Sequence, residues 1–386
     1  MTDERMKVLT MLEQGKITAT EAASLLEALN KSSRPEPVRE MASHIGPILD
    51  KMGHMVDQIP EQVASEHLPK IGKGVGRVVE NLSRFLNQGL GLLESHLQPT
   101  YNFEQTLGWE DLADITCLEV QNVHGTVRVI GEDRSNVSIQ VVANIPGETQ
   151  EAAQSYFANH PATLQREGGQ LRLAAPTLLS TNKALGFFQR HRYDFECRVP
   201  RHLLPLVSNV SGDVHLDGLQ FKGNGRIKTI SGDLRVHGVS GDLDLNTVSG
   251  DIALDGMQGN ADMKTVSGDL SLRDGVTSGS LSTVSGDIEV GARLSGELRL
   301  KTISGDIELR VETTYPISAN STSGDLNVQL LSGSSGYVDA STRSGDLQLG
   351  LALEEALLGK RHAKGKLAGG TAPISLSSVS GDIELR

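Results

Sequence analysis

The chain has 386 residues, of which 38% are hydrophobic and 3% aromatic, and it carries a formal net charge of −12. This length allows two or three domains and a large core, which must be mostly aliphatic. The excess of acidic residues excludes nucleic acid as a partner, because binding a phosphate backbone needs clustered cations.

The first residues, MTDERMKV, lack the basic and apolar regions of a secretory signal, and no apolar run approaches the roughly 18 residues of a membrane span. We therefore expect a cytoplasmic protein. The two cysteines, Cys117 and Cys197, have neither metal-ligand spacing nor the pattern of a disulfide framework. We expect both to be buried as small hydrophobic residues.

Residues 1–30 have the pattern of a helical hairpin. Gly15 is a stop signal for the first helix, and Thr18 with Glu21 forms a capping box for the second. Two helices of about twelve residues cannot bury enough surface to fold alone, so we expect them to dock on a partner or on a second copy. The apolar residues expected to make this contact are Leu9, Leu12, Leu25, Leu26 and Leu29.

Residues 31–100 are predicted to form amphipathic helices, with a heptad seam that Gly46-Pro47 should kink. The seam residues expected to make contacts are Ile45, Ile48, Met52 and Met55. Three alternatives stay open: helices that pack on each other or on the β region, a coiled-coil oligomer, and peripheral contact with a membrane. Membrane contact is the least favoured, because the cations between Lys70 and Arg84 lie opposite the apolar face rather than beside it.

Residues 101–210 change to an alternation of apolar and polar residues, which is typical of half-buried strands. The clearest runs are 118–120, 127–129, 137–141, 171–173 and 193–199. Residues 147–160 interrupt them with helical spacing and predict a short inserted helix. We interpret Arg190, His191, Arg192 and Asp194 as part of a surface loop.

Residues 211–386 contain ten copies of Ser-Gly-Asp, each opening an apolar-x-apolar run, with a period near 18 residues and a half-period of 9. Such a period indicates stacked repeats, and it predicts coils of two short strands and two turns. Glycine reaches positive φ without penalty, and Asp and Ser side chains accept hydrogen bonds from nearby backbone N–H groups, so the tripeptide closes a tight turn. The predicted turn residues are Gly212, Asp213, Gly232, Asp233, Gly250, Asp251, Gly268, Asp269, Gly286, Asp287, Gly305 and Asp306.

Stacked coils would align these aspartates in a column. Two charges about 4.8 Å apart repel by roughly 0.9 kcal/mol in water, whereas a hydrogen bond to a charged acceptor returns roughly 1.5–3 kcal/mol. The turn can therefore hold its carboxylates without metal, and we expect neither a metal ion nor a cofactor. The less favoured alternative is a Ca²⁺ ladder at Asp251, Asp269, Asp287, Asp306 and Asp325.

The sequence ends inside a predicted strand that contains Ile383 and Leu385. An unpaired strand of this kind either folds back to pair internally or recruits another chain, so both residues are candidates for an interaction. The basic stretch from Lys360 to Lys366 is interpreted as a loop, either solvated or in contact with an acidic partner or anionic lipid.

No fingerprint of a hydrolase, a metalloprotease or a nucleotide-binding enzyme is present, and the acidic residues keep the repeat register as turn residues would. We therefore expect no enzymatic activity. A β-helix that binds or cleaves carbohydrate remains the alternative from the enzyme class.

The stretch LEVQNVHGTVRVIGEDRSNVSIQV, the Val199-Pro200 step and the Ser-Gly-Asp array together resemble the putative-adhesin β-strand repeat proteins called toastrack domains. The opening MTDERMKVLTMLEQGKITATEAASLLEAL is similar to the SHOCT-like bihelical module that precedes toastrack domains in bacterial proteins of the YvlB and LiaX type. The resemblance implies a right-handed single-stranded β-helix with no catalytic residues. It also implies a role in a phage-shock or Lia-type envelope-stress network, through protein contacts near the membrane.

These observations lead to one organisation and one functional hypothesis. The organisation is a SHOCT-like hairpin at 1–30, a helical region at 31–100, a first β part at 101–210 and a β-solenoid at 211–386. The hypothesis is a homo-oligomeric scaffold or sensor that binds a protein of the envelope-stress pathway in the cytoplasm or at the inner face of the membrane. A surface adhesin is the remaining alternative.

Overall fold

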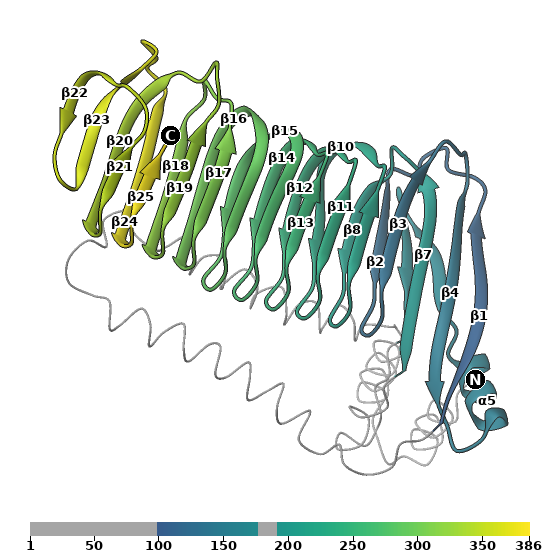
Figure 1. The fold of residues 1–386 in the computed structure, drawn as a ribbon. Coiled ribbons are helices and arrows are strands. Elements are labelled where there is room, and N and C mark those ends of the chain that lie inside the picture. Colours follow the sequence, from purple (N-terminus) through teal and green to yellow (C-terminus); the bar gives the residue numbers. More distant parts are fainter. Residues whose placement is uncertain (1–98, 177–190) are drawn as a thin grey trace, which may run out of the picture. The chain divides into compact units, whose positions relative to one another are not determined.

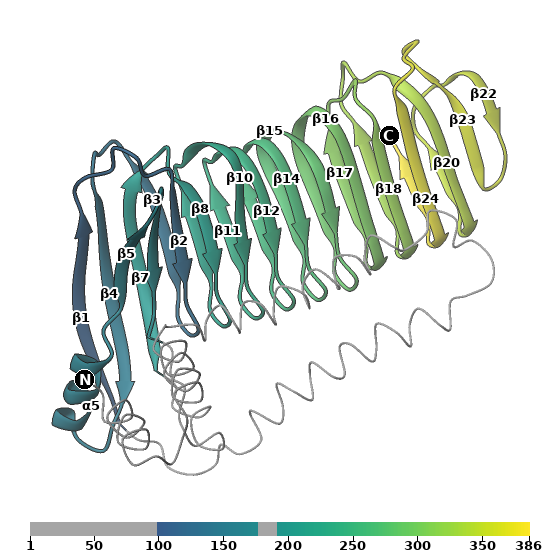
Figure 2. The ribbon, with the colours of Figure 1, turned by 180° about the vertical axis from the view of Figure 1, so that it is seen from behind.

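The computed structural model describes residues 99–176 and 191–386. The helices predicted in residues 1–98 lie outside these ranges. The described part is a β-solenoid with one short helix, α5 (Gln150–Asn159), and the predicted mainly β fold is confirmed. Figures 1 and 2 show its strands stacked side by side from β1 at one end to β22 and β23 at the other. Within the described ranges, no helix is both long enough and apolar enough to cross a membrane.

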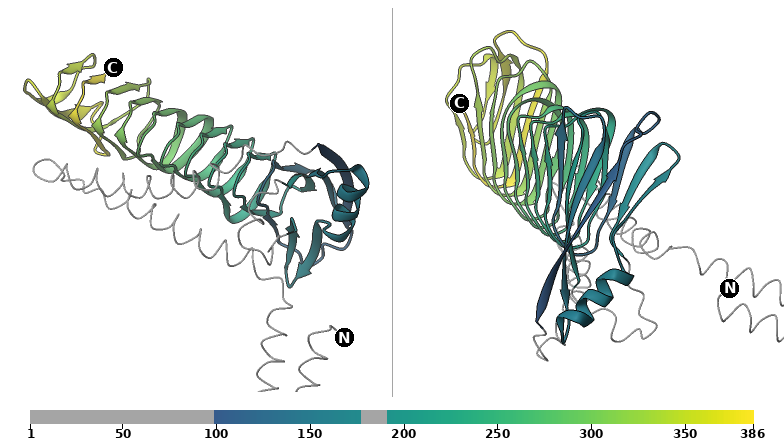
Figure 3. Two further views of the ribbon diagram at one scale, coloured as in Figure 1. Left: turned by 90° about the horizontal axis from the view of Figure 1, so that it is seen from below. Right: turned by 90° about the vertical axis from the view of Figure 1, so that its right-hand side faces the viewer.

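Each coil of the solenoid contributes one strand to each of two parallel ladders, which Figure 3 shows as the two sides of the coils. The first ladder contains β9 (Val214–Asp217), β11 (Leu234–His237), β13 (Ile252–Asp255), β17 (Ile307–Val311) and β19 (Leu326–Leu330). The second contains β8 (Leu204–Ser208), β10 (Gln220–Lys228), β12 (Ser240–Asn246), β14 (Gln258–Lys264) and β18 (Ile317–Ser323). The longer strands β15 (Leu270–Ser282) and β16 (Ile288–Ser304) pass through both ladders.

The alternation in the sequence explains the core. The apolar residues that follow each Ser-Gly-Asp pair with their equivalents in the next coil, as Leu234 does with Ile252 and Ile252 with Leu270. All three are at most 1% exposed. The core is therefore a set of aliphatic columns that run along the stack, as the low aromatic content predicts.

Antiparallel strands surround the start of the solenoid. The rung of β2 (Cys117–Gln121) and β3 (Val127–Glu132) pairs in parallel with β8 and β9 on one side, and each of its strands pairs in parallel with one further strand on the other. Beyond β3 lie β7 (Arg192–Pro200), β4 (Val137–Pro146) and β1 (Thr100–Trp109), in that order, and beyond β2 lie β6 (Gln170–Ala174) and β5 (Thr163–Glu167). The helix predicted at 147–160 is present as α5, and its N-cap Thr149 accepts a hydrogen bond from the backbone N–H of Ala152.

The order of the strands departs from the sequence at the other end. The last two strands, β24 (Pro373–Ser380) and β25 (Ile383–Leu385), lie between the coil of β18 and β19 and the coil of β20 (Gly336–Ser344) and β21 (Leu347–Leu349). A hairpin of β22 (Glu354–Leu358) and β23 (His362–Leu367) pairs antiparallel with the outer side of β20. The basic stretch predicted as a loop is therefore largely the strand β23.

Both cysteines lie in the core, as the sequence predicts. Cys117 is 3% exposed and Cys197 is fully buried. Burial raises the pKa of both thiols, and the neighbouring Glu119 and Glu196 raise it further. Neither is therefore a reactive thiolate at neutral pH.

Candidate functional site: the Ser-Gly-Asp column

The glycines of the repeat stack directly on one another. Gly250, Gly268 and Gly286 have φ values of 153° to 157°, a region that side-chain-bearing residues rarely adopt. A Cβ atom on Gly268 would lie closer than 3.0 Å to the carbonyl oxygen of Gly250, and the same overlap recurs along the column. Glycine is required here because of its backbone conformation, and also because the turns of neighbouring coils lie too close together to leave room for a Cβ atom.

The aspartates form a second column beside the glycines, and each one links two coils. The Oδ1 atom of Asp251 accepts a hydrogen bond of 2.9 Å from the backbone N–H of Asp269, and Oδ1 of Asp269 accepts one of 2.8 Å from the N–H of Asp287. The sequence predicted a hydrogen bond that closes the turn from within. The bond instead runs between coils, because parallel stacking places the N–H of the next aspartate about one strand spacing away.

A third column consists of hydroxyl groups two residues before most of the repeats. The side chains of Thr265, Thr283 and Thr302 donate hydrogen bonds of 3.2–3.3 Å to the glycine carbonyl of the preceding coil. Ser321 stands in the place of threonine and makes the same bond at 3.2 Å. These residues are at most 5% exposed, so the bonds satisfy buried polar groups.

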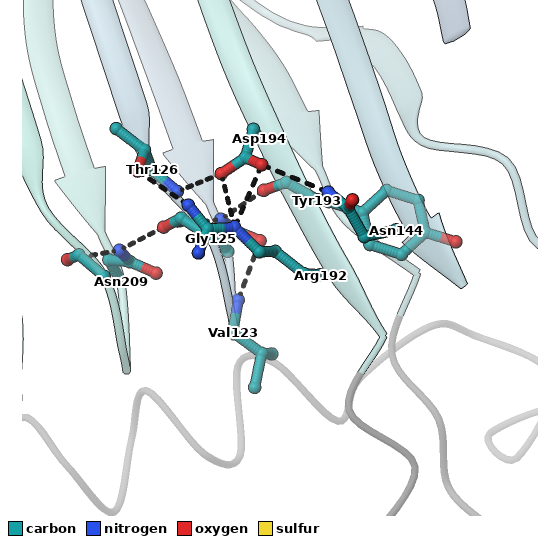
Figure 4. Close-up of polar contacts among 10 residues, drawn as sticks. Val123, Gly125, Thr126, Asn144, Arg192, Tyr193, Asp194 and Asn209 are labelled. Carbon is teal, nitrogen blue, oxygen red and sulfur yellow. Dashed lines mark hydrogen bonds and ion pairs between the residues drawn. The ribbon is translucent and has the colours of Figure 1, made fainter. Parts of the chain in front are cut away.

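At the start of the column Asn209 takes the place of the hydroxyl residue, and Asp194 takes the place of the repeat aspartate (Figure 4). Asn209 donates from Nδ2 to the carbonyl oxygens of Gly125 at 3.0 Å and Gly212 at 2.8 Å. Asp194 accepts a hydrogen bond of 2.7 Å from the backbone N–H of Thr126. Its carboxylate also binds Arg192 at 2.9 Å and Asn144 at 3.3 Å.

The interpretation of residues 190–194 as a surface loop is therefore wrong for Arg192 and Asp194, which belong to β7. Asp194 was missed because it is not preceded by Ser-Gly. A signal for it exists in the sequence, since Asp-Phe-Glu-Cys at 194–197 has the same Asp-apolar-x-apolar pattern as the repeats.

The repeat and its geometry match a known family model. The model described as Toastrack DUF4097 matches residues 206–313 and 275–386. The repeat region of this chain belongs to the toastrack family. A second model, described as a SHOCT-like domain, matches residues 3–34. No protein of curated function matches the chain in sequence.

Several solved structures are similar to the toastrack chain in fold. One, described as a "putative adhesin" from Bacteroides fragilis, has 12% identity and a TM-score of 0.39, over 74% of this chain and 97% of that one. A "putative lipid binding protein" from Parabacteroides distasonis has 15% identity and a TM-score of 0.37, over 73% and 96%. A "putative cell adhesion protein" from Clostridium sporogenes has 9% identity and a TM-score of 0.22, over 74% and 99%.

The toastrack aspartates do not come together as a conventional metal site. Within residues 99–176 and 191–386, no group of three or more His, Cys, Asp or Glu side chains is arranged to hold a metal ion. The proposed ladder residues Asp251, Asp269, Asp287 and Asp306 each use one carboxylate oxygen to bind the next coil. Their observed role is thus to join coils.

The structure places the two C-terminal interaction candidates in the core. Ile383 and Leu385 are both fully buried, and β25 pairs with β19 on one side and β21 on the other. The strand folds back to pair internally, so it offers no exposed edge to another chain. The other candidates, from Leu9 to Met55, lie outside the described residues.

The exposed edges of the toastrack region lie elsewhere. Among the described residues, four strands pair with a single neighbour: β1 with β4, β5 with β6, β21 with β25, and β22 with β23. Leu357 and Leu358 in β22 are 67% and 65% exposed. The nearby lysines of β23 are paired, since Lys364 lies 2.7 Å from Asp339 and Lys366 lies 2.8 Å from Glu355, and both contacts raise the pKa of the lysine.

Proposed function

We propose that this toastrack protein is a non-enzymatic scaffold or sensor in a bacterial envelope-stress system and acts through protein contacts. The combination of a SHOCT-like module at 3–34 with a toastrack region at 206–386 supports this proposal. The same combination occurs in the YvlB- and LiaX-type proteins that the sequence resembles. The repeated carboxylates also support it, because they hold the coils together rather than face a substrate.

The observation that carries the proposal is the open edge of β1. This strand pairs with β4 over all ten of its residues without a bulge, and no other strand of the described ranges pairs with it. The backbone N–H of Gly147 donates a hydrogen bond to the carbonyl oxygen of Pro99, so these two opposite residues form a hydrogen-bonded pair. Because such pairs alternate along an antiparallel ladder, the backbone N–H and C=O groups of the odd-numbered residues of β1 point toward β4, and those of the even-numbered residues point away from it. Thr100, Asn102, Glu104, Thr106 and Gly108 therefore present a row of backbone donors and acceptors.

Proteins usually protect such an edge with lysine, proline or a bulge. Between Thr100 and Trp109 there is no lysine or proline, and Glu104 is the one charged side chain. An extended segment of a partner can therefore add to the sheet as a further strand. We assign this edge to a protein partner of the stress pathway, which the chain meets in the cytoplasm or at the inner face of the membrane.

The test is capture of partners by the full chain in a bacterial host, with and without envelope stress. Thr106→Pro removes one outward N–H from the β1 edge, and Thr106→Val is the matched control because it keeps that N–H. We expect stress-dependent partners to be recovered with the parent chain and the valine variant and lost with the proline variant. Equal recovery with all three chains would contradict the role of the β1 edge, and recovery of no stress protein would contradict the proposed function.

Cell fractionation separates this proposal from the adhesin alternative. A stress scaffold is expected in the cytoplasmic and inner-membrane fractions and is resistant to protease added to intact cells. An adhesin is expected to be digested under the same conditions.

A further inference from the structure

Residues 373–386 form a coil that lies inside the stack although it comes last in sequence. Its strand β24 pairs in parallel with β18 on one side and with β20 on the other. Its strand β25 pairs in the same way with β19 and β21. The coil thus fills a slot between two coils that precede it in the chain, as Figure 1 shows near the C-terminal label.

The inserted coil completes the toastrack columns on both of its faces. Asp382 donates from its backbone N–H to Oδ1 of Asp325 at 2.7 Å, and its own Oδ1 accepts from the N–H of Asp346 at 2.8 Å. In the hydroxyl column, Ser378 donates to the carbonyl of Gly324 at 3.1 Å, and Thr342 donates to the carbonyl of Gly381 at 2.8 Å.

The core columns also continue through the inserted coil. The apolar residues that it contributes are Ile374, Leu376, Ile383 and Leu385, and all four are fully buried. Without this coil the stack would be interrupted, with two unpaired coil edges and an open core.

The connection to the rest of the chain is short and turns sharply. Residues 368–372 join β23 to β24, and Ala368 and Gly369 adopt left-handed φ values of 49° and 64°. The coil is therefore held mainly by strand pairing and core burial, and this turn joins it to the residues that precede it. An element of this kind is what proteins exchange in domain swapping.

We propose that residues 373–386 act as a donor coil, which a second copy of this chain can supply to the slot between β18–β19 and β20–β21. This inference stands without the envelope-stress function, because it rests on strand order and packing alone. It also offers a route to self-association that differs from recruitment by an exposed C-terminal edge, which was one of the two alternatives that the sequence left open.

The slot selects an occupant of its own kind. A Cβ atom on Gly381 would overlap the carbonyl oxygen of Gly324, and one on Gly345 would overlap that of Gly381. An occupant must therefore carry glycine at this turn, an acceptor after it and aliphatic residues at the core positions. Residues 373–386 meet these requirements, and the other Ser-Gly-Asp coils are held within the continuous stack on both sides.

A cysteine pair reports which copy supplies the coil. Ser341 and Ser377 are register partners on β20 and β24, and neighbouring strands are close enough for a disulfide. Full-length chains that carry Ser341→Cys or Ser377→Cys are unfolded together, refolded by dilution at several protein concentrations and then oxidised. The native Cys117 and Cys197 are shielded by burial in the refolded protein.

We expect a cross-linked product at twice the 41.3 kDa of the chain, in a yield that rises with protein concentration. The control mixture combines Ser341→Cys with Ser318→Cys, since these positions pair with opposite sides of β24 and not with each other. The chain that carries both Ser341→Cys and Ser377→Cys should close its disulfide internally when refolded at low concentration, without a change in mass.

Two results would overturn the proposal. The first is a yield from the Ser341→Cys and Ser377→Cys mixture no greater than that of the control at every concentration, while the double variant closes internally. The second is failure of the double variant to close its disulfide, which would show that residues 373–386 do not occupy the slot.

Discussion

Replacement of Gly268 by alanine tests whether the glycine column holds the toastrack coils together. Gly268 has a φ of 157°, and its Cβ position lies against the carbonyl oxygen of Gly250 and near the carboxylate of Asp251. The substitution therefore combines an unfavourable backbone conformation with a clash against backbone atoms that flank it in the stack. Neither term can relax by rotation of a side chain.

The size of the effect follows from these two terms. A residue with a side chain in a region reserved for glycine costs about 1–3 kcal/mol, and overpacking against fixed neighbours costs about 1–3 kcal/mol more. Gly268→Ala should thus lower the free energy of unfolding by about 2–6 kcal/mol. Because repeat proteins couple mainly between neighbouring coils, the loss should concentrate in the coils on either side.

Substitutions at two further glycines separate the cost of the backbone conformation from the cost of the clash. Gly238 has a left-handed φ of 59° but no atom within 4 Å of its Cβ position, so Gly238→Ala should cost only about 1–2 kcal/mol. Gly291 has neither feature, and Gly291→Ala should leave stability unchanged or raise it by a few tenths of a kcal/mol. Urea unfolding of the three full-length variants, followed by circular dichroism, measures the order. If Gly268→Ala unfolds at the same urea concentration as Gly291→Ala, the stacking argument is wrong.

Substitutions at three other positions test hydrogen bonds of the column and the charge of a nearby histidine. Asp269→Ala should lower the free energy of unfolding by about 1 kcal/mol, because the backbone N–H of Asp287 loses its acceptor. Asp269→Asn keeps an acceptor oxygen and should be nearly neutral. Urea unfolding measures both. Asn209→Ala removes the amide that donates to the carbonyl oxygens of Gly125 and Gly212. It should lower the free energy of unfolding by about 1–3 kcal/mol in the same assay. Equal stability of Asn209→Ala and the parent would refute the role of Asn209 at the first rung. His215 has a pKa below its usual 6.5 because of burial first and the charges of Arg128 and Arg235 second, with Asp213 and Asp233 opposing them. As the pH falls below about 6.5, the unfolded chain therefore binds more protons at His215 than the folded chain does, and stability decreases. The parent should lose more stability on acidification than His215→Gln. Parallel profiles of stability against pH for the two chains would exclude this linkage.

The regular part of the fold was predictable because its determinants are local. Each Ser-Gly-Asp turn and the apolar-x-apolar run after it lie within seven residues, so spacing alone predicts two strands per coil. The aliphatic core follows from the same alternation, as Leu234, Ile252 and Leu270 show. The threonine two residues before the motif also recurs in the sequence, as Thr265, Thr283 and Thr302 show.

The partners of polar groups were not predictable in the same way. A hydrogen bond that the Asp269 carboxylate accepts from its own turn and one that it accepts from the next coil would use the same repeated residues at the same spacing, and only the stacked geometry decides between them. Asp194 accepts its hydrogen bond from Thr126 across β7, a strand that follows α5, β5 and β6 in the chain. The distance in sequence between Asp194 and Thr126 therefore does not match the period of the repeat. The open edge of β1 depends on which strands pair across the sheet, which local alternation does not encode.

The position of the last coil follows from the hairpin that precedes it. In a stack of similar coils, local pattern does not determine order, because each coil presents the same glycine, aspartate and aliphatic columns to its neighbours. β23 pairs antiparallel with one side of β20, so a strand that follows β23 through the short turn at 368–372 finds only the opposite side of β20 free. That side faces β18, and β24 fills the space between the two strands. The hairpin therefore closes the outer end of the ladder and also directs residues 373–386 inward. This topology makes the coil a separable element, because the coils on both sides of it belong to chain segments that precede it.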